Sequence, residues 1–215
     1  MHTQETRAAA GCLVIDELRS GGEPASGFRF LRALAGVEVQ VFRQRPGGGL
    51  WDDLQTALQA LRAKCETASI LSRGTGCAAA LALAAQLPVE RLALVDPDLS
   101  PGRFGAFARQ SGRGACDPLL FTQICRLSDF ARRNLALCVS DVLMIERGGD
   151  REARALRRGL SAHGRVFTLR LDGDLGDEMY TVRENTVKQA LSCFLCRGEL
   201  PKTLAENAEM CIIYG

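Results

Sequence analysis

The sequence has almost no excess charge, very little histidine and no long apolar run. Its 215 residues hold 27 Lys and Arg against 25 Asp and Glu, a net charge of +2 that provides no basic face for nucleic acid. No apolar run reaches the roughly 18 residues of a membrane span, and the start MHTQETRAAAGC lacks the apolar core of a signal peptide. These absences predict a cytoplasmic protein that binds neither nucleic acid nor membranes.

The composition is that of a globular domain. Hydrophobic residues make up 47% and charged residues 24% of the chain, and the sequence contains no internal repeats or low-complexity tracts. A chain of this size buries about 70% of the surface that its unfolded form exposes. We therefore expect one domain over residues 1–215 that needs no disulfide, metal or cofactor to fold.

Nine cysteines are scattered through the chain. In a reducing compartment, most of their thiols are expected to act as small buried hydrophobic groups. Cys193-x-x-Cys196 has the spacing of a metal or redox pair, but the chain has no second pair, and the motif falls within a predicted helix and not at its start. The pair is therefore predicted to pack in the core on one buried stripe.

Short apolar runs alternate with stretches of helical periodicity along nearly the whole chain. Strands are predicted at 12–15, 37–41, 68–71, 91–95, 141–145 and 166–169, and helices at 26–35, 51–64, 77–87, 119–134, 151–162 and 180–196. Val37, Val39 and Val41 alternate with polar residues, which predicts a strand near a sheet edge. Right-handed crossovers then give an α/β fold, a doubly wound, mostly parallel sheet with helices on both faces.

Two segments do not fit a simple alternation. Residues 99–138 are about twice as long as a crossover requires, so we expect a short helical insertion there that could form a small lid. Residues 198–215 are weakly patterned and are expected to form a C-terminal tail.

The segment Ile70-Leu71-Ser72-Arg73-Gly74-Thr75-Gly76-Cys77-Ala78-Ala79-Ala80 resembles the nucleophile elbow of the α/β-hydrolase superfamily: a strand, a sharp glycine-flanked turn and a helix of small residues. The segments around it follow the family order. Residues 13–22 resemble the first strand and oxyanion loop, 89–97 the strand after the elbow helix, 142–150 the strand that delivers the acid, 166–177 the last strand and its loop, and 180–196 the closing helix. The resemblance covers about residues 12–197 and implies an α/β-hydrolase-like fold with a reduced core.

The residues of the catalytic triad are largely missing. In the pattern Gly-x-Ser-x-Gly, Ser72 takes the place of the first glycine and Gly74 that of the nucleophile. Asp150 stands at the acid position. The loop 170–180, where the family carries its histidine, has none, and the chain's two histidines are His2 and His163. Because acylation needs a nucleophile and a base, we predict a non-catalytic protein, a pseudo-hydrolase that binds a small ligand or a protein partner.

Two alternatives remain. The chain could be an active hydrolase with an unconventional catalytic set drawn from Ser72, Cys77, Asp150 and the acidic loop 172–177, or an obligate subunit whose base comes from another chain. For Ser72 and Cys77, packing at a crowded strand end is the simpler interpretation. Asp150 could also bind a cation together with the nearby acidic residues Asp96, Asp98, Asp174 and Asp177, but Asp in such loops usually bonds its own backbone, and no metal is predicted.

The turn from Arg73 to Gly76 is the predicted ligand site. It leads directly into a helix whose first amides lack intrahelical partners, so the N–H groups from Gly74 to Cys77, that of Thr75 among them, are expected to bind a small anion such as a carboxylate, sulfate or phosphate. The Thr75 hydroxyl either contacts this ligand or caps the helix.

Overall fold

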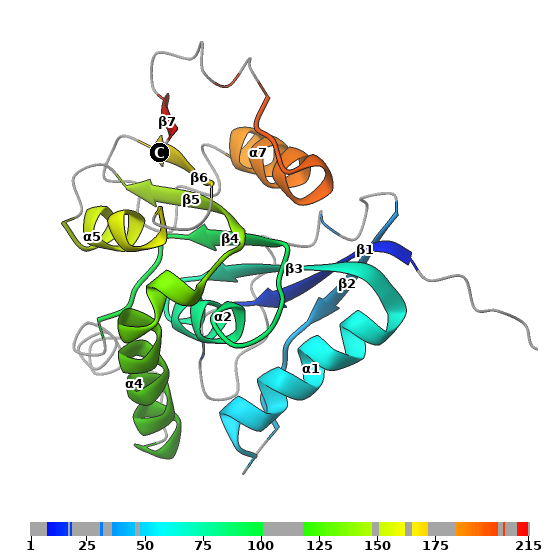
Figure 1. Ribbon diagram of the computed structural model, residues 1–215, viewed down its shortest axis with the longest axis vertical. Helices are drawn as coiled ribbons and strands as arrows, with labels where there is room; N and C mark the ends of the chain where they lie inside the picture. Colours follow the sequence, from blue (N-terminus) through cyan, green and yellow to red (C-terminus); the bar gives the residue numbers. More distant parts are fainter. Residues whose placement is uncertain are drawn as a thin grey trace, which may run out of the picture.

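The computed structural model describes residues 8–16, 18, 31, 36–45, 48–100, 118–147, 151–161, 165–171, 184–201, 204 and 210–214. Its centre is a seven-stranded sheet in the order β2-β1-β3-β4-β5-β6-β7 (Figure 1). The strands are β1 (Ala8–Ile15), β2 (Val37–Val41), β3 (Cys65–Arg73), β4 (Arg91–Val95), β5 (Asp141–Arg147), β6 (Val166–Leu171) and β7 (Met210–Tyr214).

The sheet confirms the predicted fold class. Each predicted strand is present, β1 to β6 are all parallel, and β2 lies at an edge as its alternating sequence indicates. The exception is β7, which pairs antiparallel with β6. It lies in the tail 198–215, for which no strand or helix was predicted. Its sequence, MCIIY, is a short apolar run that periodicity alone does not assign to a strand.

Helices cover both faces of the sheet. They are α1 (Leu50–Lys64), α2 (Gly76–Ala84), α4 (Pro118–Arg133), α5 (Arg151–Leu160) and α7 (Glu184–Arg197), with a 3₁₀ turn, η2 (Leu135–Leu137), after α4. The helices α1, α2, α4 and α5 share one core with the sheet, and α7 packs on the opposite face (Figure 1). The predicted helix 26–35 lies almost entirely outside the described residues. Among the described helices, none is long and apolar enough to cross a membrane.

The predicted insertion 99–138 is described only in part. Residues 101–117 lie outside the described part of the chain. In the remainder, α4 packs against α2 and buries Leu120, Ile124 and Ala131 in the core below the sheet. The lid over residues 101–117 stays a prediction.

The elbow helix α2 can lie very close to the sheet because its side chains are small. Its sequence, GCAAALALA, is buried at every position. The strands on which it rests, β3 and β4, are also buried in their central parts, as expected for the middle of a parallel sheet. Apolar packing of α2 on β3 and β4 therefore holds the strand–turn–helix unit that carries the candidate site.

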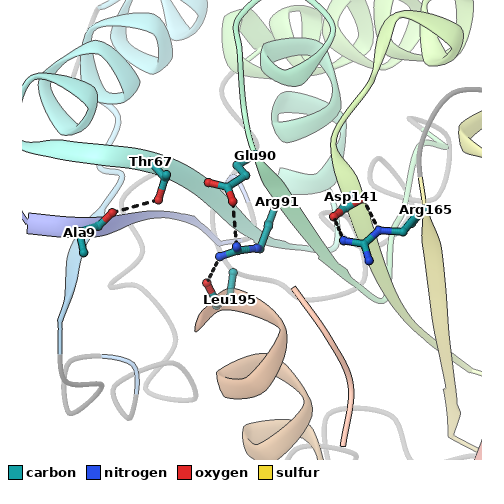
Figure 2. A network of polar contacts seen from close by, with 7 residues as sticks. All are labelled: Ala9, Thr67, Glu90, Arg91, Asp141, Arg165 and Leu195. Carbon is teal, nitrogen blue, oxygen red and sulfur yellow. Dashed lines mark hydrogen bonds and ion pairs between the residues drawn. The ribbon is translucent and has the colours of Figure 1, made fainter. Parts of the chain in front are cut away.

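A polar network ties the elements together at the amino ends of the strands (Figure 2). Arg91 at the start of β4 donates a 2.8 Å hydrogen bond to the carbonyl oxygen of Leu195 and forms an ion pair with Glu90. Arg165 forms an ion pair with Asp141 at the start of β5. Because a cation favours the carbonyl end of a helix, Arg91 anchors the end of α7 to the sheet, at the edge opposite the candidate site.

Candidate functional site

The candidate site lies at the carboxyl edge of the sheet, where β3 turns into α2. Gly74 forms this turn with φ of +55°, in the left-handed region that favours glycine. Asp96, which follows the neighbouring strand β4, has φ of +47° and is the one described residue other than glycine with a positive φ. Strained backbone of this kind clusters at functional sites, and here it marks two adjacent strand ends.

Both backbone groups of Gly74, its N–H and its carbonyl oxygen, are hydrogen-bonded within the protein. Its N–H donates to the carbonyl oxygen of Val95 at 3.0 Å, and its own carbonyl oxygen accepts from the N–H groups of Cys77 at 3.1 Å and Asp98 at 3.2 Å. The expectation that all amides from Gly74 to Cys77 face a ligand is therefore wrong for Gly74 and Cys77. The backbone hydrogen bonds outside helices and strands include none donated by the N–H of Thr75 or Gly76 to a described residue.

Gly76 is required by a close approach of the chain. A Cβ at this position would lie 2.6 Å from the carbonyl oxygens of both Ile15 and Asp16. Backbone at such a distance cannot yield to a side chain, so glycine is needed for the start of α2 to pack on the end of β1. The last glycine of the elbow pattern thus has a structural reason independent of catalysis.

Of the two roles that the sequence suggested for the Thr75 hydroxyl, capping of α2 is wrong. The side chain makes no capping bond to α2, and its Oγ1 accepts a 3.2 Å hydrogen bond from the N–H of Leu18. Leu18 belongs to the segment 13–22 that resembles the oxyanion loop. At least one amide of that segment is therefore satisfied by the protein itself, through an acceptor on a residue that is 8% exposed.

Ser72 and Cys77 are sealed inside the core. Both side chains are 0% exposed, and Ser72 Oγ lies 3.4 Å from Cys77 Sγ and 3.4 Å from the carbonyl oxygen of Ala93. Burial raises the pKa of the Cys77 thiol to about 12, although its hydrogen bonds to Ser72 and Val95 act in the opposite direction. Since a thiol reacts as thiolate, this environment is that of a packing residue.

Arg73 is balanced by a carboxylate that the sequence analysis did not single out. Its Nε lies 2.8 Å from Asp16 Oδ1, and the two side chains are 15% and 11% exposed. Asp16 directly follows β1, next to β3 in the sheet. The charge of Arg73 is therefore partly neutralised at the predicted ligand site.

A second ion cluster lies along the same edge, on β5 and β6. The Glu146 side chain is 3% exposed, with Arg170 Nη2 at 3.1 Å and Arg157 Nη1 at 3.8 Å from its Oε1. Its strand position places it near the end of β5, so a buried carboxylate exists here that no motif indicated. Asp150, Asp174, Asp177 and both histidines lie outside the described residues, and the described part of the chain contains no metal-binding group of three His, Cys, Asp or Glu residues.

The prediction for the pair Cys193 and Cys196 is wrong in one respect. Cys193 is half-buried and Cys196 is exposed, so the two thiols do not share a buried stripe. Residues three apart near the end of α7 straddle the boundary of its apolar face, and Phe194 and Leu195 are the residues that point into the core. Of the other described cysteines, Cys12, Cys65, Cys77 and Cys138 are buried and Cys125 is half-buried.

Comparison with known proteins gives structural neighbours only. No family model matches the chain, and no curated protein matches it. An enol-lactonase from Burkholderia xenovorans LB400 is 16% identical, with a TM-score of 0.60 over 88% of this chain and 92% of that one. The esterase Pf2001 from Pyrococcus furiosus is 12% identical, with a TM-score of 0.60 over 90% and 83%. A monoglyceride lipase from Saccharomyces cerevisiae is 13% identical, with a TM-score of 0.54 over 87% of each chain. At these identities the likeness concerns the fold alone.

Proposed function

We propose that this chain, which has the α/β-hydrolase fold, is a non-catalytic member of that fold class that binds a small anionic ligand at the carboxyl edge of its sheet. One observation carries the proposal: Gly74, with φ of +55°, occupies the tip of the strand–turn–helix unit. A nucleophile of this fold sits at that tip, and glycine brings no side chain to it.

The residues next to the tip support the same conclusion. The side chains of Ser72 and Cys77 are buried and hydrogen-bonded to each other. Neither reaches the surface where a substrate would arrive. An unconventional hydrolase would need one of them within reach of both a base and a substrate. The described residues therefore favour the non-catalytic proposal over the active alternative.

The ligand would be held by the backbone. The amides of Thr75 and Gly76 lie at the start of α2, where the partial positive charge of the helix favours an anion. Asp16 lies close by and reduces the attraction by neutralising Arg73. We therefore expect a small carboxylate or phosphate to bind weakly, with a dissociation constant on the order of 1 mM.

The absence of catalysis is tested with a fluorophosphonate probe and with Gly74→Ser. The wild-type protein should not be labelled, and the variant should gain no appreciable esterase turnover because a new hydroxyl would lack an activating base. A known serine esterase treated in parallel shows that the probe is active. Stoichiometric labelling of the wild type at any serine would overturn the proposal.

Ligand binding is tested by titrating the ¹⁵N-labelled protein with acetate and inorganic phosphate. The amide signals of Thr75 and Gly76 should shift with saturation, whereas those of Gly74 and Cys77, which are bonded to the protein, should shift much less. Asp16→Asn should tighten binding several-fold by releasing the charge of Arg73. Two outcomes would contradict the assignment of this turn as the ligand site. One is an equal chemical-shift change at all four amides, and the other is no chemical-shift change at about 50 mM anion.

A further inference from the structure

The outer edge of β2 has backbone groups that no described residue satisfies. β2 is the first strand of the sheet, and its one strand neighbour in the described chain is β1. The N–H of Phe42, just beyond β2, donates to the carbonyl oxygen of Val14 on β1. Because successive residues of a strand direct their N–H and C=O groups to opposite sides, those of Val37, Val39 and Val41 point away from β1, toward the open edge.

β2 contains few of the devices that usually keep an edge strand unpaired: it has one exposed charge and no lysine, proline or bulge. Natural edges carry lysine, proline, a bulge or inward-pointing charges. The sequence of β2 is VEVQV, and its register against β1 runs without interruption from Val37 to Val41. Its one charged residue is Glu38. The three valines are half-buried on the same face as α7, so a second strand would extend an apolar surface that already exists.

We propose that this edge pairs with the same edge of a second copy of the chain, antiparallel and centred on Val39. The outward groups of Val39 would then meet those of the partner's Val39, and Val37 would meet the partner's Val41. Each outward N–H and C=O of the three valines finds an acceptor or a donor in this register, because the outward residues are those that form the hydrogen-bonded pairs of an antiparallel ladder.

The sequence of β2 favours this register over its neighbours. In the register centred on Val39, Glu38 lies opposite the partner's Gln40. The amide of that Gln40 can donate a hydrogen bond to the Glu38 carboxylate. A register centred on Glu38 would place two glutamates directly opposite each other, which is destabilising. A register centred on Gln40 would pair fewer residues of the strand. The arrangement around Val39 pairs the full length of β2 without a like-charge contact.

The first test is sedimentation equilibrium of the full chain over a range of concentrations. The wild type should dimerise, and Val39→Pro should raise the dissociation constant at least about tenfold, because proline removes an N–H that points outward and is tolerated at that position of an edge strand. Val39→Thr keeps the N–H and should still dimerise. A protein that stays monomeric at several hundred micromolar, or a dimer that Val39→Pro leaves unchanged, would overturn the proposal.

Charge variants at the neighbouring position test the register. Gln40→Lys places a cation opposite Glu38 and should tighten the dimer at low salt, whereas Gln40→Glu places two carboxylates there and should weaken it. Both differences should shrink as salt is added. Equal dissociation constants for the two variants at low salt would exclude the register centred on Val39.

Cysteine cross-linking tests the same register covalently, in a Cys196→Ser background that removes the exposed thiol. Val39→Cys should form an intermolecular disulfide under mild oxidation, because directly opposed residues have Cα atoms about 5.5 Å apart. Val37→Cys alone should not cross-link, whereas Val37→Cys combined with Val41→Cys should. Cross-linking of Val37→Cys at the rate of Val39→Cys would place the strands in another register.

Discussion

The Oγ1 of Thr75 accepts a 3.2 Å hydrogen bond from the backbone N–H of Leu18. This contact joins the turn at the start of α2 to the segment that follows β1, and it is buried. The N–H of Leu18 is therefore satisfied within the protein. At the same turn, Arg73 forms its ion pair with Asp16.

Removal of this hydroxyl should destabilise the protein. Thr75→Val preserves the shape of the side chain and leaves the N–H of Leu18 without an acceptor, so the free energy of unfolding should fall by about 1–3 kcal/mol. Thr75→Ser keeps the hydroxyl oxygen, so its free energy of unfolding should fall much less. Urea unfolding followed by circular dichroism measures both; equal losses for the two variants would show that the methyl group and not the hydroxyl matters.

A methyl group at Gly76 should be poorly tolerated. Gly76→Ala would place a Cβ 2.6 Å from the carbonyl oxygens of Ile15 and Asp16, so α2 must move away from β1 at a cost of about 3 kcal/mol. Gly49→Ala is the matched control, since its Cβ would come no closer than 3.0 Å, to a flexible carboxylate oxygen of Asp52. Thermal unfolding should separate the two variants clearly, and similar midpoints would argue against the close packing of the elbow.

The thiols should differ strongly in reactivity. Burial raises the pKa values of Cys12 and Cys77 to about 12, so these thiols stay protonated and enclosed at pH 8, whereas Cys196 is exposed. A disulfide reagent at pH 8 should therefore modify Cys196 first and Cys12 and Cys77 only upon unfolding. Mass spectrometry of the modified peptides gives the order; early modification of Cys77 would support the alternative in which it is a nucleophile.

The same pKa values predict a loss of stability in alkali. The unfolded thiols lose their protons near pH 9.0, whereas those of folded Cys12 and Cys77 keep them to about 12. The stabilisation is complete below pH 9 and is lost as the pH rises above it, because the unfolded state alone gains by ionising. A double variant with Cys12→Ala and Cys77→Ala should show a shallower fall of unfolding free energy between pH 9 and 11 than the wild type, and identical slopes would refute this origin.

The buried carboxylate of Glu146 should matter more than either of its partners. Glu146→Ala leaves Arg157 and Arg170 without their shared anion and should cost about 2–4 kcal/mol. Arg170→Met leaves Glu146 still paired with Arg157 and should cost less. Denaturant unfolding of the two variants gives the ranking, and a larger loss for Arg170→Met would mean that packing of the arginine stem dominates.

Local sequence patterns were sufficient for the fold class and for locating the turn around Gly74. Burial on both faces leaves a short apolar run in the sequence of the central strands, and the alternation of valine with polar residues marks the edge strand β2. The turn around Gly74 was visible because a strand, a glycine-flanked tip and an Ala-rich helix follow one another directly. The absence of a side chain at that tip is a property of residue type and required no structure.

The contacts that define the site were decided by tertiary structure alone. Leu18 meets Thr75 and Asp16 meets Arg73 across 57 residues of sequence in each case, because β1 and β3 become neighbours when the sheet forms. The same holds for Glu146, whose partners lie on another strand and on a helix, and for the exposed thiol of Cys196. Periodicity reports which face of its own element a residue occupies, whereas the partner that it meets there depends on strand order and register, which no local pattern contains.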